Sequence, residues 1–121
     1  MTAEEAKRFR SLAARINYVA QDRPDLSLAA CVLASRVAKP RRGDEQHLKR
    51  VVLYILGFPR ACVEFQWQEQ GATLVGTTDS DWATCRRTRI SKSGGTVTRG
   101  LHLLHHCCKM QDRVALSTGE A

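Results

Sequence analysis

Two aspartates near the middle of the chain have the residue type and spacing for metal chemistry. Asp79 and Asp81 lie two positions apart in the run LVGTTDSDWAT, residues 74–84, which has a strand-like composition. Because successive side chains of a strand alternate between faces, both carboxylates should point the same way. Two like charges on one face repel each other unless something positive lies between them. A divalent metal ion, a basic loop containing Arg86 and Arg87, or water alone would meet this requirement.

A second cluster has the residue types of a zinc site but a poor spacing. Its members are His102, His105, His106, Cys107 and Cys108. Adjacent residues of a strand face opposite ways, and no second pair follows at the spacing of a zinc finger. We therefore expect a strand end with its cysteines in the core and its histidines outside, rather than a zinc site. A Cys–His nucleophilic pair is also not expected, because no orienting group or oxyanion hole is recognisable.

Basic residues form two groups in a chain whose net charge is +7. The first group is Lys39, Arg41, Arg42, Lys49 and Arg50. The second is Arg86, Arg87, Arg89, Lys92 and Arg99. Such a charge favours nucleic acid as a partner, and no basic helix with a clean apolar face suggests a membrane. Contacts from either group to phosphates would be independent of sequence and weakened by salt, whereas an ordinary solvated surface is the alternative.

The rest of the composition indicates where in the cell the protein is expected and how large its core can be. Five cysteines without a CxxC pair, and no signal peptide or spanning segment, favour reduced thiols and an intracellular location, cytoplasmic or nuclear. With 121 residues, 43% of them hydrophobic and 6% aromatic, the chain has enough for one modest and mostly aliphatic core. Trp67 and Trp82 could stack on bases, but packing within the protein is the role we expect for both.

The first half of the chain has the periodicity of helices. Apolar residues recur at intervals of three and four. This pattern predicts three helices, over residues 4–20, 25–38 and 44–56. Thr2 and Glu5 have the spacing of a capping box for the first helix. Asp22 is the expected cap of the second helix, with Pro24 in its first turn, and Asp44 is the expected cap of the third.

After about residue 58 the apolar period changes from 3.6 to 2, which is typical of strands. Four strands of an antiparallel sheet are predicted, near residues 62–68, 73–81, 95–104 and 113–117. A turn at residues 68–71 should join the first two strands as a hairpin. Ser117 and Glu120 form another capping box, which predicts that a helix begins there. The predicted fold class is α+β, with an N-terminal helical region followed by a small, incomplete antiparallel sheet.

Five segments, in this order, resemble the reverse transcriptase–ribonuclease H region of copia-type retrotransposon polyproteins. They are FRSLAARINYVAQDRPDLSLAACVLAS, HLKRVVLYILGFP, LVGTTDSDWAT, SKSGGTV and QDRVALSTGEA. Each segment alone is a weak signal, and the ordered set is more specific than any one of them. The resemblance implies that residues 1–60 are similar to the thumb or connection region of the polymerase, and that residues 61–121 are a partial ribonuclease H-like domain.

The resemblance also implies roles for individual residues. Asp79 matches the first metal-binding aspartate of the family, and Asp81 and Trp82 match the rest of that motif. The parent activity would be RNA-directed DNA synthesis with Mg²⁺-dependent hydrolysis of RNA in RNA–DNA hybrids. The catalytic glutamate of the family is expected after Ala121, and no polymerase YxDD-type motif precedes Phe9. Two-metal hydrolysis needs several carboxylates, so Asp79 is expected to be a remnant with a weak, incomplete metal site, helped at most by Asp81.

These observations lead to an expected function and two alternatives. We expect a fragment of a copia-type polyprotein that is inactive alone, holds no stably bound Mg²⁺, and binds an RNA–DNA hybrid or another polyanion weakly. One alternative is a basic nucleic-acid-binding module without catalysis. The other is an interaction fragment that folds with a partner, such as the remainder of the polyprotein, which would supply the missing helix.

Overall fold

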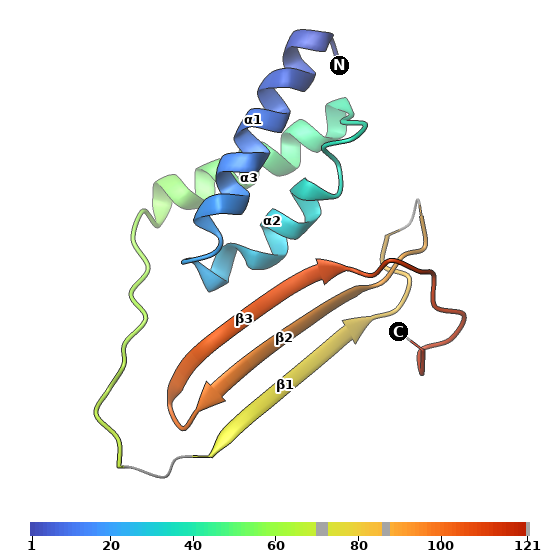
Figure 1. Ribbon diagram of the computed structural model, residues 1–121. Helices are drawn as coiled ribbons and strands as arrows, with labels where there is room; N and C mark the ends of the chain where they lie inside the picture. Colours follow the sequence, from blue (N-terminus) through green and yellow to red (C-terminus); the bar gives the residue numbers. More distant parts are fainter. Residues whose placement is uncertain (70–72, 86–87, 121) are drawn as a thin grey trace. The chain divides into compact units, whose positions relative to one another are not determined.

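The computed structural model describes residues 1–69, 73–85 and 88–120, and the chain divides into two compact units, Met1–Ala61 and Cys62–Ala121 (Figure 1). The first unit contains α1 (Ala3–Val19), a 3-10 turn η1 (Pro24–Leu26), α2 (Ser27–Ala34) and α3 (Arg42–Gly57). The second contains β1 (Leu74–Asp81), β2 (Lys92–Arg99) and β3 (His102–Met110). The fold class is therefore α+β, as predicted.

The helices begin close to where the sequence predicts. At the start of α1 the Thr2 hydroxyl accepts from the Glu5 N–H at 3.2 Å, and the Glu5 carboxylate accepts from the Thr2 N–H at 2.6 Å, so the capping box is confirmed. The cap position predicted for Asp44 is wrong: Arg41 occupies it, and Asp44 lies in the first turn of α3, where its carboxylate accepts from the Arg41 N–H at 2.7 Å. The prediction that Asp22 caps the second helix is wrong. Proline at the first position of η1 holds the preceding residue, Arg23, out of the helical region, so Arg23 occupies the cap position.

The helical unit buries one apolar core. Its fully buried members are Phe9, Ala13, Ile16, Ala20, Leu26, Ala30, Leu33 and Leu48. Phe9, Leu26 and Leu33 are each only 1% exposed, so α1, η1 and α2 all contribute to its centre. Val51 and Ile55 of α3 are half-buried against it. The predicted apolar stripes are thus largely confirmed, except that Val19 of α1 and Val52 and Leu56 of α3 are exposed.

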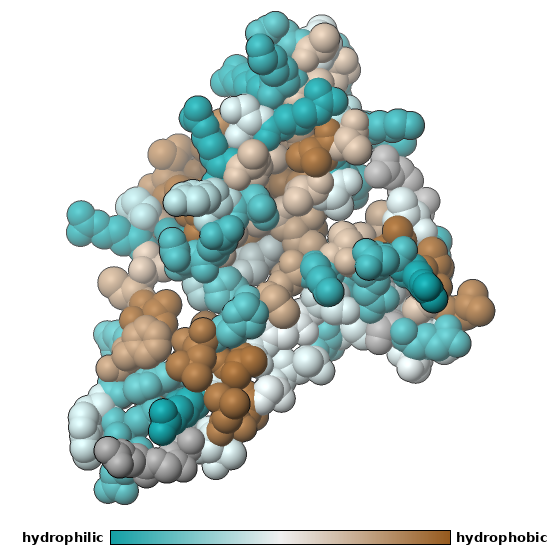
Figure 2. Space-filling model, viewed as in Figure 1, coloured by the Kyte–Doolittle hydropathy of each residue, from teal (hydrophilic) through white to brown (hydrophobic). Residues whose placement is uncertain are grey.

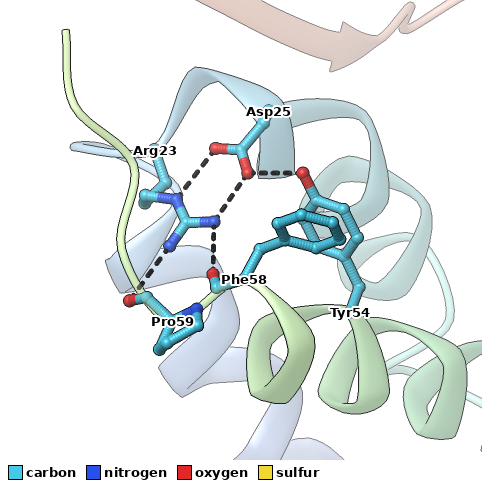
Figure 3. A network of polar contacts seen from close by, with 5 residues as sticks. All are labelled: Arg23, Asp25, Tyr54, Phe58 and Pro59. Carbon is cyan, nitrogen blue, oxygen red and sulfur yellow. Dashed lines mark hydrogen bonds and ion pairs between the residues drawn. The ribbon is translucent and has the colours of Figure 1, made fainter.

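A polar network joins η1 to the end of α3 (Figure 3). The Arg23 guanidinium donates to both carboxylate oxygens of Asp25, at 2.9 and 2.7 Å, and also to the carbonyl oxygens of Phe58 and Pro59. The Tyr54 hydroxyl donates to the same carboxylate at 3.0 Å. These hydrogen bonds, those from Arg23 first, outweigh partial burial and lower the pKa of Asp25 to about 2. The charged turn thereby fixes how the chain leaves α3.

The sheet is an antiparallel meander in the order β1–β2–β3. Its register places Asp79 opposite Gly94 and Asp81 opposite Lys92. The predicted strand near residues 73–81 is confirmed as β1. The predicted strand over residues 95–104 is instead two strands, because Gly100 adopts φ 56° in a two-residue turn between Arg99 and His102.

Two further predicted strands are wrong. Residues 62–69 form no strand, and neither do residues 113–117. The first stretch alternates in polarity, but its Phe65 and Trp67 side chains are 61% and 87% exposed, so no buried face rewards the alternation. The turn predicted at residues 68–71 lies largely outside the described residues. No helix begins at Ser117, because the Glu120 carboxylate accepts from the Leu116 N–H and the chain forms a turn.

The sheet unit buries very little. Among its described residues only Ala83 and Ser91 are buried. Six of the eight residues of β1 are exposed, and Leu101 at the β2–β3 turn is 74% exposed. Apolar and hydrophilic side chains are accordingly interspersed over the molecular surface (Figure 2). The sheet is held mainly by its backbone ladder and by a few polar side-chain contacts.

Replacing Asp25 by Asn should destabilise the helical unit at pH 7 by about 1 kcal/mol, because the side chain is 29% exposed and solvent screens part of the charge interaction. Because the folded pKa of Asp25 is depressed, its contribution is fully present above about pH 4 and is lost as the pH falls toward 2. The variant and the wild type should therefore converge in acid. Urea unfolding followed by helical circular dichroism at both pH values measures this. Asp22→Asn, an exposed aspartate on the same loop, is the control and should change little; equal losses in both variants would contradict the network's role.

Candidate functional site

Strand β1 carries both candidate aspartates, two positions apart and hence on one face of the sheet. Their cross-strand neighbours differ. Asp81 lies opposite Lys92, whereas Asp79 lies opposite Gly94, which has no side chain to meet a carboxylate. The register of β1 against β2 therefore gives the two carboxylates different surroundings.

Asp81 is engaged in the structure of the sheet. One carboxylate oxygen accepts from the Lys92 backbone N–H at 2.6 Å, and the other accepts from Lys92 Nζ at 2.9 Å. Partial burial raises the pKa of Asp81, but hydrogen bonds from Thr84 and Lys92 outweigh it and the net pKa is lowered. Asp81 therefore fastens the end of β1 to the start of β2. The basic partners named from sequence, Arg86 and Arg87, lie outside the described residues.

Asp79 is exposed and makes no side-chain hydrogen bond or ion pair within the described part of the chain. It borders an open groove on the sheet whose floor contains Gly94 and Gly95. The groove is also lined by Thr78, Ser80, Ser93, Cys107 and Lys109. Because side chains alternate along a strand, the Thr78 and Ser80 hydroxyl groups face the opposite side of the sheet from the Asp79 carboxylate, which remains open to a hydrogen-bond donor or a cation.

The described residues do not form a site for a resident metal ion. Within residues 1–69, 73–85 and 88–120, no three His, Cys, Asp or Glu side chains are grouped as ligands. Mg²⁺ needs near-octahedral oxygen coordination, and Asp79 alone supplies one carboxylate while Asp81 is held by Lys92. Asp79 therefore fits a weak outer contact to a hydrated ion better than a closed metal site.

The histidine and cysteine cluster is spread along β3. The expectation that its cysteines lie in the core is wrong, because Cys107 is exposed and Cys108 is only half-buried. The physical reason is that the sheet unit has almost no core for them to enter. No disulfide bond joins the cysteines of the described residues. His102 contacts Gln66 and Gln68.

The first basic group is presented by the helical unit. Arg42, Lys49 and Arg50 are exposed, and at 100° per residue they fall on one side of α3, opposite the buried Asp44 and Leu48. Lys39 and Arg41 are exposed just before this helix. The group thus forms a cationic stripe, defined here as Arg42, Lys49 and Arg50 of α3.

The second basic group is largely engaged or outside the described residues. Lys92 is bound to Asp81, and the Arg89 guanidinium lies 5.8 Å from the centre of the Trp82 ring. Arg99 is exposed on β2. Charge is also unevenly divided in the sequence. Residues 1–61 hold twelve Lys and Arg against six Asp and Glu, a net +6, whereas residues 62–121 hold seven against six, a net +1.

Several known proteins are similar to this chain in sequence. An uncharacterized mitochondrial protein of Arabidopsis thaliana is 31% identical over 114 residues, which cover 93% of this chain and 46% of that protein. The retrovirus-related Pol polyprotein from transposon RE1 of the same plant is 30% identical over 113 residues, or 93% of this chain and 8% of the polyprotein. Over most of its length this chain is similar to copia-type retrotransposon polyproteins, as a fragment of such a polyprotein would be.

The similarity covers only part of these relatives. The chain spans about half of the mitochondrial relative and a small part of the polyprotein. A third relative, the secreted RxLR effector protein 161 of Plasmopara viticola, is 36% identical over 98 residues, which cover 81% of this chain and 68% of that protein. No family profile matches the chain. No solved structure matches it either.

Sequence reasoning missed several contacts around the candidate site of this copia-type fragment. Trp82 is 46% exposed rather than packed in a core, and its indole N–H donates to the Ala115 carbonyl at 3.2 Å. Ala83 adopts φ 52° and donates its N–H to the hydroxyl of the buried Ser91. Trp67 is 87% exposed.

None of the helices over the described residues has the length and apolar character needed to cross a bilayer.

Asp81→Asn should loosen the β1–β2 ladder, because the amide keeps an acceptor for the Lys92 N–H but loses the charge partner of Lys92 Nζ. Asp81 is 37% exposed, so the expected cost is only about 0.5–1 kcal/mol, or about two- to fivefold faster exchange of the ladder amides. Asp79→Asn on the same face is the matched control and should leave exchange unchanged. Amide hydrogen exchange by NMR measures both, and a larger effect from Asp79→Asn would reverse the assigned roles.

Proposed function

We propose that this chain is the segment of a copia-type polyprotein in which the connection region of the reverse transcriptase meets the start of the ribonuclease H domain. Residues 1–60 would be the thumb- or connection-like region and residues 61–121 the partial ribonuclease H-like domain. Support comes from the ordered segments, from the family relatives and from a three-stranded antiparallel sheet whose first strand carries Asp79. Its proposed contribution is to hold an RNA–DNA hybrid rather than to cleave it.

The cationic stripe of α3 is the observation that carries this proposal. From Arg42 to Arg50 the helix rises by roughly 12 Å, so the stripe reaches about two or three phosphates of a nucleic acid backbone. The side chains of Lys49 and Arg50 make no hydrogen bond or ion pair with any of the described residues, so their charges are available to a ligand. The unit that carries them has a net charge of +6, which attracts a polyanion over a longer range.

The same geometry argues against hydrolysis by these 121 residues alone. Two-metal cleavage holds two ions about 4 Å apart with several carboxylates. Here Asp79 is the free carboxylate of β1 and Asp81 is held by Lys92. Mg²⁺ would therefore belong to the parent polyprotein, where other residues supply ligands, and not to a stable site in this chain. An intracellular location, cytoplasmic or nuclear, follows from the same proposal.

A second candidate function, an interaction fragment, is favoured by the sheet unit. Only Ala83 and Ser91 are buried among its described residues, and β1 is exposed over most of its length. Exposed strands with free backbone groups pair readily with other chains. The remainder of the polyprotein would be the natural partner for such a sheet, and self-association of the isolated chain would be its experimental sign.

The double variant Lys49→Gln with Arg50→Gln should weaken binding to an RNA–DNA hybrid about tenfold at low salt, because two phosphate contacts are lost. The slope of log affinity against log salt should become shallower by about 1.8. Fluorescence anisotropy with two hybrids of unrelated sequence measures affinity, which should be the same for both. The control is Arg89→Gln with Arg99→Gln, which removes the same charge from the sheet unit and should change affinity less than about twofold. Equal losses in both double variants would contradict a contact through α3.

The chain alone should not cleave RNA in a hybrid in the presence of Mg²⁺ or Mn²⁺, because the described residues group no three metal ligands. The assay follows a labelled RNA strand and compares the wild type with Asp79→Asn. Metal-dependent cleavage by the wild type that disappears in the variant would show that the site is completed by other groups, such as Asp112, Glu120 or a second copy of the chain.

A further inference from the structure

The segment before β1 is fastened to the β2–β3 turn by one glutamine and one histidine. The Gln68 side-chain amide donates to the Arg99 carbonyl at 2.9 Å, and its oxygen accepts from the Leu101 N–H at 3.0 Å. The same Gln68 nitrogen lies 3.1 Å from His102 Nδ1, and His102 Nε2 contacts the Gln66 carbonyl. The Phe65 ring meets the imidazole edge-on at 5.2 Å.

The backbone fixes the orientation of the Gln68 amide. A carbonyl can only accept and an N–H can only donate, so the amide nitrogen must face Arg99 and the amide oxygen must face Leu101. The nitrogen that His102 Nδ1 meets is therefore a donor, and Nδ1 must accept without carrying a proton. The Gln66 carbonyl is an acceptor, so Nε2 must carry the proton. All four groups are satisfied only when the imidazole is neutral.

We propose that residues 65–68 form a latch on the β2–β3 turn, which neutral His102 holds closed and protonation of His102 opens. A second proton at Nδ1 would point an N–H at the Gln68 amide N–H₂ group, so that two donors meet without an acceptor. Rotating the amide by half a turn would bring its oxygen to Nδ1 only by breaking the bonds to Arg99 and Leu101 together, so it also opens the latch. Opening therefore frees the segment that carries Phe65 and the exposed Trp67.

The charged and titratable groups around His102 come from β2, β3 and the segment before β1. Arg99 is the cross-strand partner of His102 on β2. Glu64 lies in the segment before the latch, where its carboxylate is contacted by the Gln66 amide at 3.4 Å. Cys62 and Glu69 flank the latch, and His105 follows on β3. None of the described contacts places a carboxylate on the imidazole of His102, which would reward protonation.

The direction of the effect follows from histidine chemistry. Neutral His102 closes the latch and protonated His102 opens it, so the latch should be closed at the higher pH and open at the lower pH. The Leu101 amide reports the state directly, because its N–H donates to Gln68 only when the latch is closed. Its hydrogen exchange, corrected for the intrinsic effect of pH, thus measures the closed fraction.

The test compares the Leu101 protection factor at pH 7.5 and pH 5.5 in the full chain by NMR. Wild type should lose protection about fivefold or more on acidification, and His105→Gln, which removes an exposed histidine of the same strand, should behave like wild type. His102→Phe keeps a ring beside Phe65 but cannot titrate, so its protection should not depend on pH. Equal protection of the wild type at both pH values would overturn the latch, as would a pH dependence that persists in His102→Phe.

A second variant should reverse the direction in which pH changes the protection of the Leu101 amide. In Gln68→Glu an acceptor replaces the donor that faces Nδ1, and the other carboxylate oxygen still accepts from Leu101, but the bond to the Arg99 carbonyl is lost, so Leu101 protection should be lower than in wild type at pH 7.5. Protonated His102 then closes the latch, so Leu101 protection should increase on acidification. A loss of protection on acidification as large as in wild type would show that His102 Nδ1 does not sense the Gln68 amide.

Discussion

Apolar burial in this chain is almost confined to the helical unit, and the rest of the structure depends on that constraint. Phe9, Leu26 and Leu33 are 1% exposed at the centre of a core built by α1, η1 and α2 and completed by α3. The sheet unit has no comparable core among its described residues. Hydrophobic burial, which contributes about 25 cal/mol for each Å² removed from water, therefore stabilises the first 61 residues far more than the others.

Polar contacts take over where burial is lacking. The ladder of the sheet is reinforced at one end by Asp81 with Lys92, beside the loop where Trp82 holds Ala115. At the other end Gln68 and His102 hold the preceding segment against the β2–β3 turn. Such contacts are individually worth only about 1 kcal/mol, so the sheet is expected to open locally more easily than the helices. This is also why a single proton on His102 can have a visible effect there.

The register of the sheet and the division of charge together define the functional surface of this copia-type fragment. The register of β1 against β2 pairs Asp81 with Lys92 and Asp79 with Gly94. The Asp81 carboxylate is therefore bound within the sheet, and the Asp79 carboxylate is free. The cations that a polyanion would need are on α3, in the unit with a net charge of +6, and not around the free carboxylate. In the proposed function, contact with nucleic acid and contact with metal are thus assigned to different units.

Sequence predicted the helices well because each one repeats an apolar stripe over several turns, and caps such as Thr2 with Glu5 are local patterns. It also predicted β1 and the shared face of its two aspartates, because the alternation of side chains along a strand is likewise a local pattern. It failed where the outcome depends on partners distant in sequence. The alternating polarity of residues 62–68 could not reveal that no other element packs over their apolar side chains. The contacts of Arg23 with Phe58 and Pro59 join residues that are 35 and 36 positions apart in the sequence. The pairing of Asp81 with Lys92 depends on register, although Gly100 was a local turn signal that could have divided the predicted strand over residues 95–104.

The most direct measurement of the central claim is an NMR titration of the labelled chain with a short RNA–DNA hybrid in the presence of Mg²⁺. If α3 carries the contact, the largest amide shifts should cluster between Arg42 and Leu53, and the amides of Asp79 and Gly94 should move little. The shifts of α3 should shrink as salt is added, since the contacts are to phosphates. Shifts centred on Asp79 and its neighbours on β2, with α3 unchanged, would contradict the account and place the hybrid on the sheet.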